Sequence, residues 1–130
     1  MAGNADSGQL LKGLLDSLVL DVLAQGDNYG FGIHGQLIEK LGPDGRLVKE
    51  ASLYPLLYRL EKRGFLASYH APGDRGSPRK YYRLSAQGQD FLETRRQEWR
   101  RIARVLERTL LDQTNTEPDQ TESRNKEESP

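Results

Sequence analysis

The spacing of apolar residues changes from a helical to a strand-like pattern near the middle of this chain, and that change constrains the fold more than any other feature. Up to Leu60 the apolar residues recur every three or four positions, as in amphipathic helices. From residue 65 to 70, and again from 80 to 84, side chains alternate between two faces, as in strands. Residues 71–78 between these segments are rich in glycine and proline. Together they predict a β-hairpin with a long, basic tip.

Two helices are predicted before residue 45. The first can be capped by Asp6 or Ser7 and ends at residues 25–28. Its apolar stripe consists of Leu11, Leu14, Leu15, Leu18, Val19, Val22 and Leu23. The second runs from about Gly30 to Leu41, and residues 42–45, with the sequence GPDG, form a strong turn signal.

A third helix is predicted over residues 50–64. Its buried stripe consists of Leu53, Leu56, Leu57 and Leu60. We place Pro55 near the start of this helix, where a missing N–H is not needed, and Gly64 at its end. The order of three helices followed by a hairpin is that of a winged helix-turn-helix, so the fold class is mainly α with a small β-hairpin wing (α+β).

A long last helix is predicted to begin at Ser85, which can cap it. Its apolar stripe consists of Phe91, Leu92, Trp99, Ile102, Ala103, Leu106 and Leu110. We therefore divide the chain into a flexible N-terminus (1–8), a winged helix-turn-helix domain (9–84), a C-terminal dimerisation helix (85–111) and a disordered acidic tail (112–130). The tail is expected to be disordered because residues 113–130 contain no apolar side chain to bury.

The charge is distributed unevenly along a chain of 130 residues whose net charge is zero. Residues 113–130 contain five acidic and two basic residues, whereas residues 46–83 contain nine basic and three acidic ones, a net charge of +6. Such a stretch is expected of a phosphate-binding face, although a solvated charged surface has the same composition.

Composition disfavours several other classes of protein. The chain has no cysteine and two histidines, His34 and His70, so we expect no metal site and no cofactor. Residues 30–35 match the pattern G-x-G-x-x-G, but a dinucleotide site needs a preceding strand within a βαβ unit, and the pattern here is helical. We interpret these glycines as permitting close approach between helices or to a DNA backbone. No nucleophile motif suggests an enzyme.

The N-terminal residues lack the basic and apolar regions of a signal peptide, and no apolar run is long enough to span a membrane. We therefore expect a cytoplasmic protein that does not enter the membrane.

The third helix and the hairpin tip carry the candidate DNA contacts. A helix in the major groove must bury one face and offer polar side chains on the other. Six residues of this region supply polar side chains, though we expect that not all can face outward at once: Lys49, Ser52, Tyr54, Tyr58, Arg59 and Lys62. Residues 52, 55, 59 and 62 share one face. Arg75, Arg79 and Lys80 on the tip suit phosphate or minor-groove contact.

Trp99, the only tryptophan, is the candidate for an interface or ligand contact on the last helix. It could anchor a dimer together with Leu92, Ile102 and Leu106, or stack on a flat ligand, and the first role is favoured.

Three blocks of this sequence resemble the PadR family of bacterial transcriptional regulators. They are YGFGI at residues 29–33, SLYPLLYRLEKRGFL at 52–66 and RKYYRLSAQG at 79–88. The resemblance extends over roughly residues 9–111. It implies a homodimer that binds palindromic double-stranded operator DNA. Residues 29–31 fall where the family has a similar tripeptide, and we include Tyr29 among the candidate DNA-binding residues. The acidic tail is not part of the family pattern.

The resemblance also implies a ligand response. Some relatives release DNA when phenolic acids or flat hydrophobic drugs bind, and one stacks its ligand on tryptophans of the last helices, a placement that Trp99 resembles. A small aromatic or hydrophobic effector is therefore a possible partner. Two alternatives remain open at the level of sequence: a winged-helix protein-interaction module without DNA binding, and a small-molecule carrier built on the dimer cavity.

Overall fold

The computed structural model describes residues 13–73 and 76–112. The expected flexible N-terminus, the caps at Asp6 and Ser7, Arg75 and residues 113–130 of the acidic tail lie outside the described residues. The chain forms two compact units that divide between Thr94 and Arg95.

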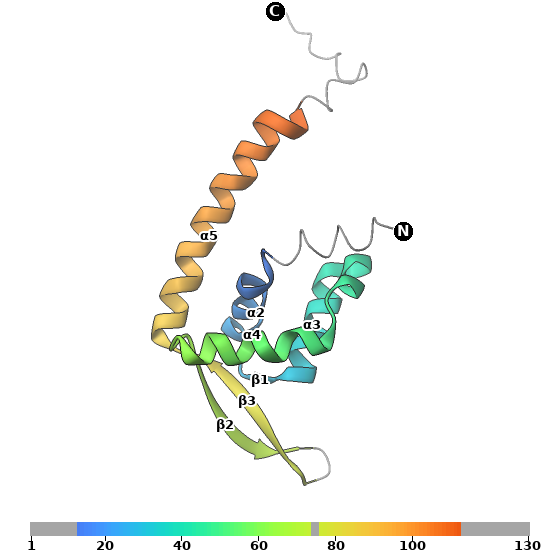
Figure 1. Ribbon diagram of the computed structural model, residues 1–130, viewed down its shortest axis with the longest axis vertical. Coiled ribbons are helices and arrows are strands. Elements are labelled where there is room, and N and C mark those ends of the chain that lie inside the picture. Colours follow the sequence, from blue (N-terminus) through green and yellow to red (C-terminus); the bar gives the residue numbers. More distant parts are fainter. Residues whose placement is uncertain (1–12, 74–75, 113–130) are drawn as a thin grey trace, which may run out of the picture. The chain divides into compact units, whose positions relative to one another are not determined.

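Three helices form the body of the first unit (Figure 1). They are α2 (Leu15–Ala24), α3 (Gly30–Leu41) and α4 (Glu50–Lys62). Between α3 and α4, where the sequence predicts a turn, the chain forms a 3₁₀ helix over Gly42–Leu47. Gly64 follows α4 with φ of 85°, a left-handed conformation that suits glycine and ends the helix as predicted.

Pro55 lies further into α4 than the sequence analysis placed it. It is the sixth residue of a helix that starts at Glu50, beyond the first turn in which backbone N–H groups have no partner. A proline here removes one helical hydrogen bond, so the expectation that its missing N–H costs nothing is wrong.

The hairpin belongs to a three-stranded antiparallel sheet. Strands β2 (Leu66–Pro72) and β3 (Pro78–Leu84) pair along their full length, with Ser68 opposite Tyr82. A third strand that the sequence analysis did not predict, β1 (Asn28–Tyr29), pairs with the other edge of β3. Two residues are too few to show an alternating pattern. The wing, defined here as β2, β3 and their connection, projects beyond the helices in Figure 1.

The predicted leucine stripes form one hydrophobic core in the first unit. Leu53, Leu56, Leu57 and Leu60 of α4 are all buried, as predicted, and pack with Ile33 and Leu37 of α3 and with the stripe of α2. Burying this many aliphatic side chains is the main favourable contribution to folding. The core therefore fixes which side of α4 remains outside.

The long helix α5 (Ala86–Leu106) is attached to the first unit by its first turns. The Ser85 hydroxyl accepts a hydrogen bond from the backbone N–H of Gly88 at 3.0 Å, the cap that the sequence predicts. Phe91 stacks on Phe65 with ring centres 4.2 Å apart. Beyond Leu106 the chain stays helical with a π-type turn over Glu107–Leu111. No helix in the described part of the chain is long and apolar enough to cross a membrane.

Candidate nucleic-acid interface

The outer side of α4 presents all of its candidate polar residues to solvent at once. The exposed side chains are Lys49, Ser52, Tyr54, Pro55, Tyr58, Arg59 and Lys62. The expectation that not all six polar residues could face outward is therefore wrong. All six can be exposed because the four buried leucines occupy one stripe of α4, which leaves a wide arc of the helix uncovered. Tyr58, one of these six residues, is 59% exposed.

Tyr54 is held in place on this surface by two neighbours. Its hydroxyl donates a hydrogen bond of 2.7 Å to the Glu50 carboxylate one turn earlier. That hydrogen bond, with smaller contributions from desolvation and the Glu50 charge, raises the pKa of Tyr54 to about 12. The ring lies against Gly30 of α3 so closely that an added Cβ there would overlap it. Gly30 thus permits close approach of a side chain from the neighbouring helix, as the sequence analysis proposed.

The G-x-G-x-x-G segment does not form a nucleotide-binding loop. Residues 30–35 lie inside α3, and the strand before them has two residues and pairs antiparallel. His34 of the same segment makes a 2.8 Å hydrogen bond through Nε2 to the backbone oxygen of Val48. This contact ties α3 to the residues just before α4.

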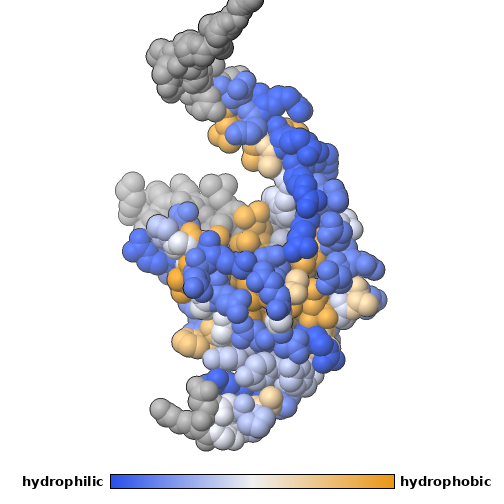
Figure 2. Space-filling model, turned by 180° about the vertical axis from the view of Figure 1, so that it is seen from behind, coloured by the Kyte–Doolittle hydropathy of each residue, from blue (hydrophilic) through white to orange (hydrophobic). Residues whose placement is uncertain are grey.

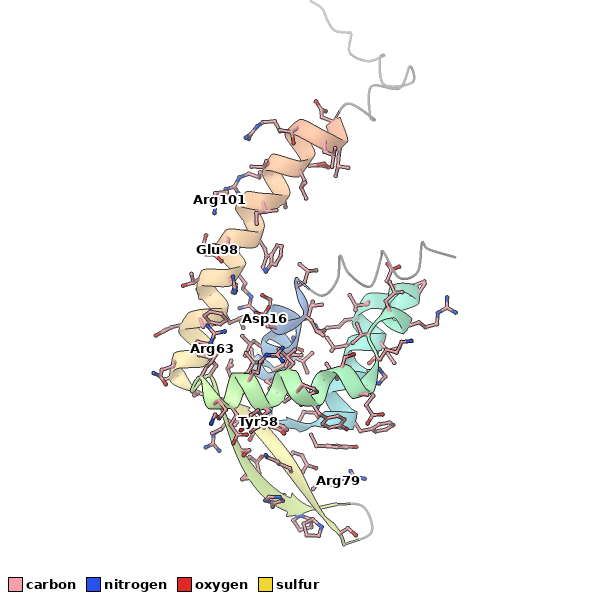
Figure 3. The ribbon with its side chains drawn as sticks, viewed as in Figure 1. Asp16, Tyr58, Arg63, Arg79, Glu98 and Arg101 are labelled. Atoms are coloured by element: carbon pink, nitrogen blue, oxygen red, sulfur yellow. The ribbon has the colours of Figure 1, made fainter. Side chains whose placement is uncertain are left out.

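The outer face of the sheet carries stacked tyrosine and arginine side chains. Tyr81 packs edge-on against Tyr29, with ring centres 5.4 Å apart, and stacks on Tyr69 at 5.7 Å. Arg79 lies over the ring of Tyr29 at 4.3 Å, and Arg83 lies over Tyr69 at 5.7 Å. Figure 3 shows Arg79 on the wing. Cation–π contacts of this kind orient the two guanidinium groups while leaving their charge in place.

The inner face of the wing is tied to α4 by Glu61. The Ser68 hydroxyl on β2 donates a 2.5 Å hydrogen bond to Glu61 Oε2, and Lys80 Nζ on β3 lies 3.5 Å from Glu61 Oε1. Lys80 also lies over the ring of Tyr82, 5.4 Å from its centre. One carboxylate therefore contacts both strands of the wing.

A pocket of about 390 Å³ opens where α3 begins, beside α4 and β3. Its walls are Tyr29, Gly30, Phe31, Tyr54, Arg79, Lys80 and Tyr82. The pocket brings together four residues of the predicted site (Tyr29, Tyr54, Arg79 and Lys80), whereas Ser52, Arg59 and Lys62 lie outside it on the exposed side of α4. Two cations among aromatic walls suit an anionic group attached to a ring, such as the sugar-phosphate of a nucleic acid backbone.

The hydropathy of the surface agrees with this arrangement. Figure 2 shows the wing coloured mainly blue to white, while the orange residues gather over the helices. In Figure 3 Tyr58 lies on the side of α4 where the hairpin also lies. The exposed side of α4 and the wing together form what we call the basic face, which includes most of the described basic residues of the stretch 46–83.

The candidate interface residues of α5 have different environments. Leu92 is 1% exposed and belongs to the core of the first unit, so it is not available to a partner and its placement at an interface is wrong. In the second unit, Trp99 is half-buried, whereas Ile102 and Leu106 are exposed. Val105, Leu110 and Leu111 add to the exposed apolar surface there.

Residues 19–94 match the model of the transcriptional regulator PadR-like family. The match begins inside α2, includes α3, α4 and the whole sheet, and ends within α5, which is more than half of the chain. The chain belongs to the PadR-like family of transcriptional regulators. The resemblance found in the sequence is confirmed.

Solved structures of transcriptional regulators share this fold. A PadR-like transcriptional regulator from Bacillus cereus is 31% identical, with a TM-score of 0.68 over 77% of this chain and 94% of that one. A transcriptional regulator from Clostridium thermocellum is 28% identical, with a TM-score of 0.70 over 78% of this chain and 98% of that one. A curated relative, an uncharacterized protein of Lysinibacillus sphaericus called protein X, is 30% identical over 75% of this chain and 89% of its own length.

PadR-like membership assigns the protein to the DNA-binding transcriptional regulators and not to a family of enzymes. The mainly helical fold with a small sheet as wing is likewise confirmed. Family membership alone gives no role to an individual residue of the basic face.

Proposed function

We propose that the protein is a sequence-specific, dimeric transcriptional repressor whose basic face binds operator DNA. The observation that carries the proposal is the joint exposure of the polar side of α4 and the cationic wing in one unit. A helix with a buried leucine stripe and an exposed polar arc is what the major groove accommodates. Ser52, Tyr54 and Arg59 are the candidates for base contacts, with Lys49 and Lys62 at the ends of α4.

The wing is proposed to contact the sugar-phosphate backbone. Arg79 and Lys80 of β3 line the pocket beside Tyr29 and Tyr54. Arg75, outside the described residues, belongs to the segment that connects β2 and β3. Contacts to phosphate fix the position of a protein on DNA, whereas contacts to base edges carry the sequence information. The wing should therefore contribute affinity and α4 sequence preference.

Dimerisation is proposed to use the exposed apolar residues of α5. Ile102, Leu106 and Leu110 recur at helical spacing and are exposed in a single copy. A second copy offers an identical surface, as two-fold symmetry requires. A dimer with two basic faces implies a palindromic operator.

Electrophoretic mobility shift on the DNA upstream of the protein's own gene tests the proposal. A specific complex that survives excess random duplex is expected. If the protein shifts no DNA at all, the alternative of a winged-helix protein-interaction module replaces it.

A ligand response is proposed as a second property, with Trp99 as the contact for a planar aromatic effector. Trp99 is half-buried and is the only tryptophan, so its fluorescence reports directly on this site. Titration with planar aromatic compounds should quench that fluorescence and release bound DNA. Quenching without any effect on DNA would instead favour a carrier of small molecules.

A further inference from the structure

Glu61 occupies an unusual position for an acidic residue, because it lies beside a cation that the proposed function assigns to DNA. It belongs to the last turn of α4, and its two carboxylate oxygens contact opposite strands of the wing. Oε2 accepts the hydrogen bond from Ser68, and Oε1 lies 3.5 Å from Lys80 Nζ. Lys80 in turn lines the pocket that we assign to the DNA backbone.

This ion pair is open to solvent. The side chain of Lys80 is 44% exposed and that of Glu61 is 30% exposed. Pairs with this exposure are weak and are screened by salt, so an incoming phosphate can compete with Glu61 for the ammonium group. The pair thus favours a position of the Lys80 ammonium group beside Glu61 but does not hold it there when a phosphate approaches.

We propose that Glu61 is a positioning residue that competes with DNA phosphate for Lys80 and so lowers the affinity and salt dependence of DNA binding. This inference rests on the proposed function. Because phosphate contacts carry no sequence information, Glu61 affects operator and random DNA by the same factor. The ratio of the two affinities, which sets selectivity among competing sites, therefore stays the same, and Glu61 lowers only the overall strength of DNA binding.

Glu61→Gln is the informative substitution. Glutamine keeps the length of the side chain and an oxygen that can accept the Ser68 hydrogen bond, but it removes the negative charge. Affinity for operator and random duplex should rise several-fold at low salt. The slope of log affinity against log salt should steepen by about 0.9 for each additional phosphate that Lys80 neutralises.

Three further variants separate this effect from general ones. Lys80→Gln in the Glu61→Gln background should cancel the steeper slope. Asp21→Asn is the matched charge control, because Asp21 of α2 pairs with Lys40 of α3 at 3.4 Å with side-chain exposures of 31% and 38%, and neither residue belongs to the wing. It should leave the slope at the wild-type value. Ser68→Ala removes the hydrogen bond but keeps the carboxylate, so it should change the melting temperature and not the slope.

The outcomes distinguish this inference from the proposed function. If Glu61→Gln and the wild type give the same slope, or if Asp21→Asn steepens it equally, Glu61 does not restrain Lys80 and the inference is overturned while DNA binding stands. If the wild type binds no DNA, both the proposed function and the inference are overturned.

Discussion

At the scale of single residues, glycines allow close contacts within the first unit. Gly30 gives room to the Tyr54 ring, and Gly88 lets α5 approach the backbone of Phe65. These glycines are needed for space and not for a special backbone conformation. The effect of a substitution is therefore set by what its added Cβ would meet.

Two glycine substitutions should have opposite effects on stability. In Gly88→Ala the new methyl group would overlap the carbonyl oxygen of Phe65, which is backbone and cannot move away, so we expect a loss of about 1–3 kcal/mol. In Gly35→Ala, inside α3, an added Cβ has no neighbour within 4 Å among the described residues beyond its own helix. We expect a gain of up to about 1 kcal/mol there from helix propensity. Urea unfolding of both variants measures the difference, and equal midpoints would contradict it.

The Tyr54–Glu50 hydrogen bond should be visible in an alkaline titration. The pKa of Tyr54 is raised from 10.0 to about 12, chiefly by this hydrogen bond to the protonated form. Its stabilising effect is complete below pH 10 and disappears as the pH rises through about 12. Glu50→Ala removes the acceptor and should bring the pKa down toward 10. Ultraviolet absorbance of tyrosinate follows the titration, with Tyr54→Phe identifying the signal, and an unchanged curve in Glu50→Ala would count against the assigned contact.

At the scale of elements, α4 and the wing should divide the recognition of DNA between them. Arg59 is exposed on α4, and Arg79 lies on the wing over Tyr29. If Arg59 contacts a base, Arg59→Ala should cost about 1–3 kcal/mol on operator and much less on random duplex. Arg79→Ala should weaken both and flatten the salt slope by about 0.9 for each phosphate that is no longer neutralised.

A salt titration of both variants on operator and scrambled duplexes makes the comparison. Arg101→Ala is the control, because this arginine is exposed on α5 and is not part of the basic face (Figure 3). Equal decreases in affinity for Arg59→Ala on both duplexes would show that Arg59 contacts phosphate.

Most of the elements could be predicted from the sequence, and the exceptions have physical reasons. The burial of the α4 leucines and the helix cap at Ser85 follow from the spacing of residues that are close together in the sequence, so both could be predicted from it. Strand β1 depends instead on pairing with β3, where Asn28 meets Tyr82 from a distant part of the chain. Pairing at that range leaves no local pattern.

The contact of Glu61 with both strands of the wing could not be predicted for the same reason. Ser68 and Lys80 belong to different strands, and only the register of the sheet places both within reach of one carboxylate. The sequence shows three polar residues at these positions, but it does not show that they meet.

Leu92 illustrates a second limit on prediction from sequence. Leu92 lies on the same predicted apolar stripe of α5 as Trp99 and Leu110, yet the beginning of the stripe fills the core of the first unit and its end is exposed. A helical period reports that one face is apolar, but not which neighbour covers it. The boundary between core and interface along such a helix is therefore visible only in the fold.

At the scale of the whole molecule, the exposed apolar end of α5 makes self-association the central expectation. Ile102, Leu106 and Leu110 would remain in contact with water in a single copy. Exposed apolar surface on a helix is typical of an interface, and a second copy can bury it. The oligomeric state in turn decides how many basic faces meet one DNA duplex.

Leu106→Glu should convert the dimer to a monomer, because it places a charge in the middle of that apolar surface. Sedimentation velocity at micromolar concentration measures the change, and circular dichroism confirms that the variant is folded. Gln97→Glu is the matched control: it introduces the same charge at an exposed position of α5 that lies two residues from Trp99, on the far side of the helix. The control should remain dimeric. A wild-type protein that sediments as a monomer would contradict the proposed interface.

The same symmetry predicts the form of the operator. Two basic faces related by a two-fold axis contact two half-sites of inverted sequence, and both α4 helices can enter the major groove on one side of the duplex only at certain separations. The centres of the half-sites should lie about one helical turn apart, near 10 bp, or a multiple of it. Inserting about 5 bp between them turns one half-site to the opposite side of the DNA, so binding should fall to the level of a single half-site. Inserting about 10 bp returns both half-sites to the same side of the duplex and should restore binding. Mobility shifts on duplexes with these insertions measure the effect. The Leu106→Glu monomer should be indifferent to the insertion, and a wild-type protein that is equally indifferent would show that the two copies do not bind the operator as one unit.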